Sequence, residues 1–447
     1  MFSGRQGVLK VQSKFHQFTL AAYTHFDHRS QAYLDMNLRQ FENVPLVGSL
    51  RTAYLRQLAN TVSPAGILAW SGRIPALRRL LQRPPVSDLR RVKNIGVLRY
   101  DGMGDMVLTS GMLRELRRCV PNAKITMICR TPWAAWMRTC PWVDQVLDLE
   151  MTFPTRFYEQ RRVLQLLRFA RREIWPLELD VLLQPGTLYW YFNSRALAWF
   201  TGAPVRACWE DPNWGVDTGG GFHTHNLPFP NAWHETDKCY RMLEAVGLNP
   251  QGRHLECWWT EQEGSAAAEL AHNARNGRRQ LVALGLACSE EPRRWPKERF
   301  LEVIRAVSRE RNVSFMAFGG LDVAETCHWL AGQVPDQVCY LGPKHTLGTL
   351  WAAIAQCDLY LGNDTGFTHM AAAARVPVVD IRGLPVGARL GTRGDPCHTG
   401  PYDTICRVVR PPAGTPVDAP LDAKLVPVEP VLTATLELLS RSPAKSE

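Results

Sequence analysis

The sequence predicts an α/β protein with two doubly wound domains in tandem, preceded by a mostly helical segment. From residue 93 onward, short apolar runs alternate with stretches of helical periodicity, which is typical of repeated βα units around a parallel sheet. This alternation starts a second time near residue 279. Of the 447 residues, 45% are hydrophobic and 21% are charged. This composition is that of a globular protein and excludes a disordered one.

The first series of apolar runs predicts four strands, each followed by a turn or a helix. The strands are expected at 94–99, 124–130, 143–149 and 179–184. One helix is expected to follow the glycine turn at 102–104 and to end near Arg118, and an arginine-rich helix is expected over 158–172. We expect these elements to form a domain over 93–250.

The second series predicts another such domain over 251–441, after a hinge at 248–264 that contains an Asn-Pro pair. Its strands are expected at 280–286, 313–318, 338–341, 359–361 and 376–381. Its helices are expected at 297–309, 347–357, 367–374 and 431–440. The residues after 441 are expected to form a loose tail over 442–447.

The extension over 1–92 is expected to form helices separated by prolines. Within it, the segment 73–83 predicts an amphipathic helix with arginines around an apolar face. Residues 1–93 contain 14 Arg and Lys against 4 Asp and Glu, which accounts for the whole net charge of +10. Such a segment suits a membrane surface, an anionic lipid or a nucleic acid, or it is simply a solvated face that docks on the body.

The sequence also predicts where the protein is located and whether it binds a metal. It contains no apolar run of about 18 residues and no apolar signal core near its start, so we expect neither a membrane span nor secretion. None of its 12 cysteines has CxxC spacing, which favours free thiols in the cytoplasm. The spacing of His223, His225, His234 and Cys239 matches no metal template, so no metal is expected.

Ligands of doubly wound sheets bind at the carboxyl ends of the strands. In the first domain that place is the segment RYDGMGDMVLTSG at 99–111. Gly102 and Gly104 allow a tight turn and close approach of another molecule. Asp105 is then either a first-turn carboxylate of the following helix or a general base at the mouth of a cleft. A dinucleotide fingerprint is disfavoured because its third glycine is absent.

In the second domain the corresponding place is LGNDTGFTHMAAAA at 361–374. Asn363 and Asp364 end a strand, and a helix begins after Thr365 and Gly366. The free N–H groups at a helix N-terminus form an anion site. His369, one turn inside, is either a partly buried structural histidine or part of that site.

A third cluster is the segment ACSEEPRRWPKERF at 287–300, which also follows a strand. Its loop begins with Cys288 and Ser289. Arg293 stands among three basic residues around Trp295, and arginines bind phosphates through two nitrogens at once. The alternative is a solvated basic turn with Trp295 packed as a plug.

These three motifs, in this order over about 93–440, resemble glycosyltransferase family 9, the heptosyltransferases. The glycine turn with Asp105, the RRWPKERF segment and the Asp-Thr-Gly-x-x-His-x-x-Ala pattern carry the resemblance. It implies a GT-B fold, in which two Rossmann-like domains face a cleft. It also implies an inverting, metal-independent transfer without a cofactor, usually of heptose from an ADP-heptose to a lipopolysaccharide core.

The resemblance further implies a role for each residue. Asp105 would be the catalytic base, on an acceptor-side loop that includes Arg99, Gly102 and Gly104. Arg293 would meet the donor diphosphate, with Thr365, Gly366 and His369 around it, and Asp364 would contact the donor sugar. Asp322 or Glu325 would hold the donor ribose, and Ser289 and Asn363 are further donor-binding candidates. The partners would then be a nucleotide sugar and a glycan or glycolipid acceptor. From the charge of 1–92 we also expect contact with an anionic membrane surface, and no nucleic acid is expected.

Two alternatives remain open at the level of sequence. The same fold could serve a nucleotide-sugar epimerase, which needs further acid–base residues and no acceptor. It could also serve a non-catalytic assembly protein at the membrane surface, with the basic extension as its binding face. The 90 or so residues before the first strand are a departure from the family and leave the acceptor open between a lipid, a glycan and a protein.

Overall fold

The computed structural model describes residues 91–150, 160–186, 192–209, 223–228, 233–288, 290–388 and 394–441. The expected helical extension, including its amphipathic segment 73–83, lies outside these ranges apart from residues 91 and 92. Ser289 and the tail 442–447 also lie outside them. None of the helices within these ranges is long and apolar enough to cross a membrane.

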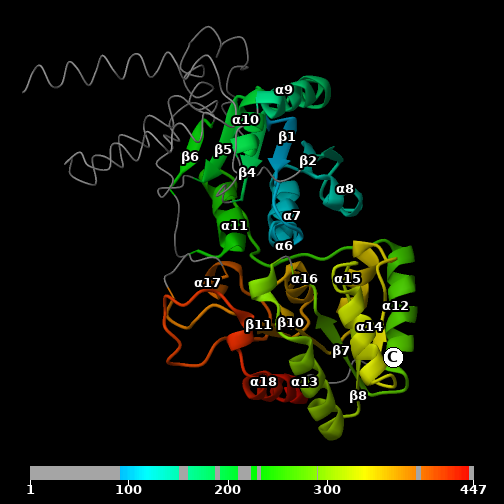
Figure 1. Ribbon diagram of the computed structural model, residues 1–447. Coiled ribbons are helices and arrows are strands. Elements are labelled where there is room, and N and C mark those ends of the chain that lie inside the picture. Colours follow the sequence, from blue (N-terminus) through cyan, green and yellow to red (C-terminus); the bar gives the residue numbers. More distant parts are fainter. Residues whose placement is uncertain are drawn as a thin grey trace, which may run out of the picture.

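The first domain is a six-stranded parallel sheet in the order β3-β2-β1-β4-β5-β6 (Figure 1). Its strands are β1 Asn94–Leu98, β2 Lys124–Arg130, β3 Gln145–Leu149, β4 Val181–Gln184, β5 Val205–Trp209 and β6 His225–Leu227. Its helices are α6 Met103–Leu108, α7 Ser110–Cys119, α8 Thr131–Met137, α9 Gln160–Phe169, α10 Phe192–Phe200 and α11 Glu235–Ala245. Because the strand order reverses between β1 and β4, a ligand site is expected outside their carboxyl ends.

The second domain has a sheet of the same kind, in the order β12-β11-β10-β7-β8-β9. Its strands are β7 Gln280–Gly285, β8 Val313–Phe318, β9 Val338–Tyr340, β10 Leu359–Asn363, β11 Val378–Ile381 and β12 Cys406–Val409. Its helices are α12 Glu261–Arg275, α13 Lys297–Glu310, α14 Ala324–Gln333, α15 Leu347–Ala355, α16 Gly366–Ala373, α17 Pro396–Thr399 and α18 Val428–Arg441. The reversal here lies between β7 and β10.

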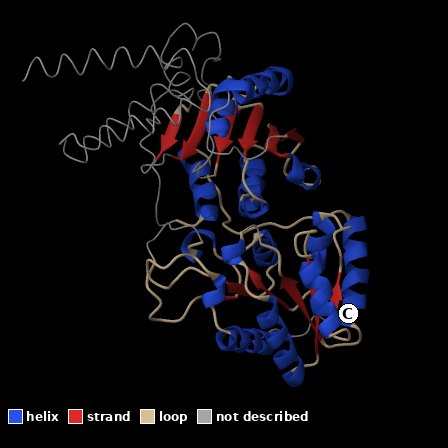
Figure 2. Ribbon diagram, in the orientation of Figure 1, coloured by secondary structure: helices blue, strands red, loops and turns tan. Residues whose placement is uncertain are grey.

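Helices cover both faces of each sheet (Figure 2), which is why strands such as β7 and β8 are buried along their whole length. In the first domain α9 and α10 lie on the outer face, whereas α6, α7 and α11 lie toward the second domain (Figure 1). In the second domain α15 and α16 lie toward the first. One cluster of buried apolar side chains extends across both domains.

All nine predicted strands are present, and two predicted helices differ. The helix expected to run to Arg118 is divided into α6 and α7 at Thr109, whose hydroxyl donates to the Asp105 carbonyl at 2.8 Å. The arginine-rich helix leaves α geometry after Phe169 and continues as a π-helix over Ala170–Ile174. Strands β5, β6 and β12 were not predicted.

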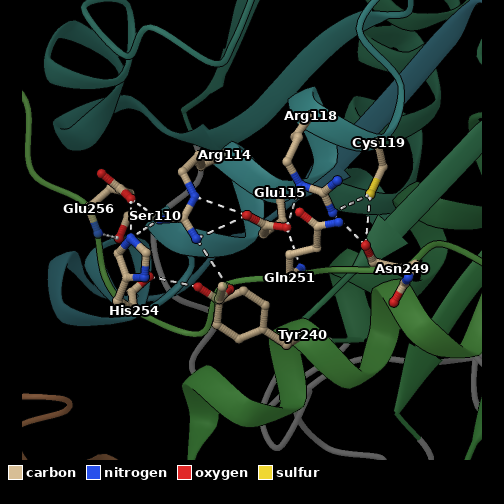
Figure 3. A network of polar contacts seen from close by, with 11 residues as sticks. Ser110, Arg114, Glu115, Arg118, Cys119, Tyr240, Asn249, Gln251, His254 and Glu256 are labelled. Atoms are coloured by element: carbon tan, nitrogen blue, oxygen red, sulfur yellow. Dashed lines mark hydrogen bonds and ion pairs between the residues drawn. The ribbon is translucent and has the colours of Figure 1, made fainter.

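The connection between α11 and α12 is fastened to α7 by polar contacts (Figure 3). The Glu256 N–H donates to Ser110 Oγ at 2.9 Å, and the Gln251 N–H donates to Glu115 Oε2 at 2.7 Å. Arg114 of α7 also contacts His254 and Glu256. These contacts fix the path of the chain where it passes from one domain to the other.

Three tryptophans pack together where the domains meet. Trp136 of α8 stacks on Trp258 of the connection, with ring centroids 4.8 Å apart. Trp351 of α15 contacts both rings edge-on, and its Nε1–H donates to the Met370 carbonyl of α16 at 2.7 Å. Aromatic packing therefore joins the first domain to the helix that carries His369.

Candidate active site between the domains

Asp105 lies in the first turn of α6, directly after the glycine turn that follows β1. Its Oδ2 accepts the Gly102 N–H at 3.1 Å, and its Oδ1 accepts from Arg99 Nη2 at 3.0 Å. Asp105 is thus a first-turn carboxylate of α6 through its Oδ2, as one of the two interpretations predicted. The side chain nevertheless keeps 35% of its surface exposed, so it is also open to solvent.

Arg99, at the carboxyl end of β1, is a buried guanidinium surrounded by carboxylates. Its Nε lies 3.0 Å from Asp101 Oδ2, and its Nη2 lies 3.6 Å from Glu235 Oε2 at the start of α11. Burial raises the pKa of Asp101, and Arg99 opposes that effect. Arg99, predicted as part of the acceptor-side loop, is therefore a buried side chain that holds Asp105 by one oxygen.

The loop after β10 places Asp364 between two arginines. Arg293 Nη1 lies 3.0 Å from Asp364 Oδ2, and Arg382 Nη2 lies 2.9 Å from Oδ1. Arg382 is itself buried and bound to Asp380 Oδ2 at 2.6 Å. Asp364 and Arg293 were each predicted as donor-site residues, but their ion pair was not. Asp380 and Arg382, in the next strand and loop, were not predicted at all.

Asn363 does not face the cleft, contrary to its predicted place in the donor site. Its Nδ2 donates to the Leu286 carbonyl at 3.0 Å and its Oδ1 accepts the Trp295 N–H at 3.0 Å. The side chain is fully buried. Asn363 thus fixes the arginine-bearing loop against β10, and through it the position of Arg293.

Trp295 is likewise internal, as the plug interpretation predicted. Its ring packs edge-on against Phe300, and its Nε1–H donates to the Val426 carbonyl at 2.9 Å. The turn before it, Glu291–Arg293, is a short 3₁₀ helix that directs Arg293 toward Asp364. The plug interpretation therefore holds for Trp295, whereas phosphate binding by Arg293 of the same segment stays a prediction.

His369 lies one turn inside α16 and is almost completely buried. Burial lowers its pKa to about 3, so the imidazole is neutral near pH 7. Its Nδ1 is buried and has no hydrogen-bond partner in the part of the chain that the structure describes. Thr365 is the N-cap of this helix, and Gly366 is its first residue.

The two motif loops, far apart in sequence, touch across the domain interface. A Cβ added at Gly104 would lie 2.7 Å from His369 Cδ2 and 3.3 Å from Gly366 Cα. A Cβ added at Gly366 would lie 2.9 Å from the Gly104 nitrogen. The helix starts that carry Asp105 and the Asp364 loop are therefore in direct contact, with glycine on both sides.

The predicted ribose contacts lie further out in the second domain. Asp322 and Glu325 are exposed, at the start of α14 beyond the end of β8. They follow the strand that neighbours β7, so they lie along the same edge of the sheet as the Arg293 loop. Within the described ranges, no group of three His, Cys, Asp or Glu side chains is placed to hold a metal ion.

Comparison with known proteins supports the predicted resemblance. Residues 187–386 match "Glycosyltransferase family 9 (heptosyltransferase)", a range that includes the second and third motifs of the predicted resemblance. No curated protein matches the sequence.

Solved structures show the same GT-B fold. A family 9 glycosyl transferase from Veillonella parvula is 22% identical with a TM-score of 0.62, covering 78% of this chain and 98% of its own. ADP-heptose LPS heptosyltransferase II from E. coli is 18% identical with a TM-score of 0.58, covering 78% and 99%. E. coli heptosyltransferase WaaC with ADP is 16% identical with a TM-score of 0.58, covering 77% and 99%.

Proposed function

Since residues 187–386 carry the pattern of glycosyltransferase family 9, we propose that this protein transfers a sugar from a nucleotide sugar with inversion. The donor is a heptose carried on ADP, and the acceptor is a lipopolysaccharide core or a related glycan. The observation that carries the proposal is the contact of Gly104 with Gly366 and His369. This contact brings the partly exposed carboxylate of Asp105, in the first domain, close to the N-terminus of α16 in the second domain, where the anionic donor would bind.

The reaction needs a base on the acceptor side. The acceptor hydroxyl oxygen attacks the anomeric carbon of the donor, and its proton passes to the Asp105 carboxylate as the new C–O bond forms. Arg99 and the Gly102 N–H hold that carboxylate by one contact on each oxygen. A fixed carboxylate can meet an incoming hydroxyl without having to reorganise.

The leaving group is a nucleoside diphosphate, whose negative charge grows as the bond from the anomeric carbon to the diphosphate oxygen breaks. In our proposal Arg293 and the free N–H groups at the start of α16 stabilise that charge, so that no metal is required. The buried Nδ1 of His369, which lacks a partner among the described residues, adds a neutral polar group. Asp364 contacts the sugar, and Asp322 or Glu325 contacts the ribose.

A thermal-shift screen tests the donor directly. A ligand that binds only the folded state at about 100 times its Kd adds about 2.7 kcal/mol of stability. We expect ADP-heptose and ADP to raise Tm, and equal concentrations of UDP- and GDP-sugars to leave it unchanged. Stabilisation by a UDP-sugar and not by ADP-heptose would contradict the proposed donor.

We also propose that the enzyme works in the cytoplasm at the inner face of the inner membrane. The support is the excess of ten positive charges in residues 1–93, because anionic lipid headgroups attract basic segments. Deleting residues 1–88 is expected to reduce co-sedimentation with anionic liposomes at low salt, with neutral liposomes as the control. Equal binding by the full-length and truncated proteins would assign these residues to docking on the protein itself.

A further inference from the structure

A row of buried charged side chains joins Asp105 to the domain interface. Arg99 Nη2 lies 3.0 Å from Asp105 Oδ1 and 3.6 Å from Glu235 Oε2. Glu235 Oε1 lies 2.7 Å from Lys238 Nζ, three residues further along α11. Lys238 is fully buried, and its Nζ lies 3.5 Å from His398 Nδ1 of α17, in the second domain. The ammonium group thus contacts both domains.

His234, which precedes Glu235, fixes this end of α11 against the second domain. Its Nδ1 accepts the Thr236 N–H at 3.1 Å, and its Nε2 lies 3.0 Å from the Gly400 carbonyl. Burial lowers the pKa of His234 to about 4, so the ring is neutral and Nε2–H is the donor to Gly400. The start of α11 therefore has a defined place when the domains are in contact.

Within this row, Asp105 and Glu235 compete for the same nitrogen of Arg99. Asp101 occupies the Nε side of the guanidinium at 3.0 Å, so three carboxylates surround one arginine. Lys238 is the second cation, and its contact with Glu235 is 0.9 Å shorter than the contact between Glu235 and Arg99. Without Lys238, Glu235 would be a buried carboxylate 3.6 Å from Arg99 that has lost its shorter ion pair, which favours movement of the arginine toward it.

We propose that Lys238 is a positioning residue for the transfer reaction. It holds Glu235, so that Arg99 stays on Asp105 and keeps that carboxylate beside the Asp364 loop. In this proposal Lys238 acts on Asp105 through Glu235 and Arg99, not by touching the substrates. The inference rests on the proposed role of Asp105 as the base.

Lys238→Met, Glu235→Gln and the double variant test this arrangement, with ADP-heptose as donor and a lipopolysaccharide core as acceptor. Lys238→Met is expected to lower kcat about 30-fold and to leave the donor KM within about 3-fold, since a displacement of about 1 Å at a reacting group costs up to about 100-fold in rate. Removing both charges frees Arg99 from Glu235. The double variant is therefore expected to recover kcat to within about 5-fold of the wild type.

Arg275→Met is the matched control, because Arg275 is a buried cation 3.2 Å from Asp358, in the second domain. It is expected to lose stability like Lys238→Met but to keep kcat. Equal kcat values in the two variants, or a folded double variant that stays slow, would overturn the positioning role. If Lys238→Met does not fold, the double variant tests the proposal instead, because it removes both members of the Lys238–Glu235 ion pair. A kcat of the double variant within 5-fold of the wild type supports the proposal, and a larger loss overturns it.

Failure of the proposed function gives a different result. No transfer by the wild-type enzyme, or wild-type turnover in Asp105→Asn, would remove the base and with it the reason for Lys238. An inactive Asp105→Asn together with a fully active Lys238→Met would leave the function standing and reject only the positioning role.

Discussion

Asp105→Asn is expected to lower turnover by about 100-fold or more while donor affinity stays within about 3-fold. The amide keeps an oxygen that can accept the Gly102 N–H, now 3.1 Å from Asp105 Oδ2, so α6 should still begin correctly. It removes the carboxylate that takes the acceptor proton, and loss of a general base typically costs about 100-fold to 10,000-fold. Steady-state kinetics and calorimetric titration with ADP measure the two quantities separately.

Glu263→Gln provides the control for the role of Asp105 in its own helix. Glu263 is also the third residue of a helix, and its Oε2 accepts the N–H of the N-cap Thr260 at 2.8 Å. It lies in α12, which is not part of the candidate active site. A comparable loss of turnover in both variants would show that the effect of Asp105→Asn is structural, whereas wild-type turnover in Asp105→Asn would exclude Asp105 as the base.

Asp105, Asp364 and Arg293 could be predicted because their signals are local. Each follows a short apolar strand within a few residues, and the carboxyl end of a parallel strand is where a doubly wound fold binds ligands. The strand–loop–helix pattern around each motif was therefore enough to place it at the sheet edge. The resemblance to a family then supplied the roles, which remain predictions for the experiments above.

Arg382, Glu235 and Lys238 could not be found in this way. Arg382 reaches Asp364 from the loop after the neighbouring strand β11, and Glu235 reaches Arg99 from a helix 136 positions later in the sequence. Only the packing of α11 against α6 and of β11 against β10 brings them together. Asn363 is the opposite kind of error, a residue predicted in the site that lies outside it. Its side chain is polar and next to Asp364 in sequence, but it holds a backbone loop.

The strands and the helix division that were not predicted also have physical causes. Strands β6 and β12 contain only three and four residues, and polar or charged side chains interrupt them, so they lack the apolar run that identified β2 and β8. The division of the predicted helix at Thr109 depends on a side-chain hydrogen bond to Asp105, which competes with the backbone ladder. The spacing of apolar residues along the sequence does not reveal such a hydrogen bond.

Gly104→Ala is expected to lower kcat by about 10-fold to 100-fold without lowering Tm. The added Cβ would lie 2.7 Å from His369 Cδ2 and 3.3 Å from the Gly366 Cα. Both belong to the other domain, and the histidine is buried, so the contact can be relieved only by moving the two loops apart. Because proximity of Asp105 to the donor sets the rate in the proposed mechanism, a shift of about 1 Å is enough for this loss.

The expected stability distinguishes this effect from damage to the fold. Gly104 lies inside α6, where alanine is a better helix former than glycine by about 1 kcal/mol. The first domain should therefore not be weakened by the substitution. Gly332→Ala in α14 is the matched control, because its added Cβ would meet nothing within 4 Å. If Gly104→Ala and Gly332→Ala have the same kcat, the contact between the two loops is not part of the working enzyme, and catalysis must use a more open arrangement of the domains.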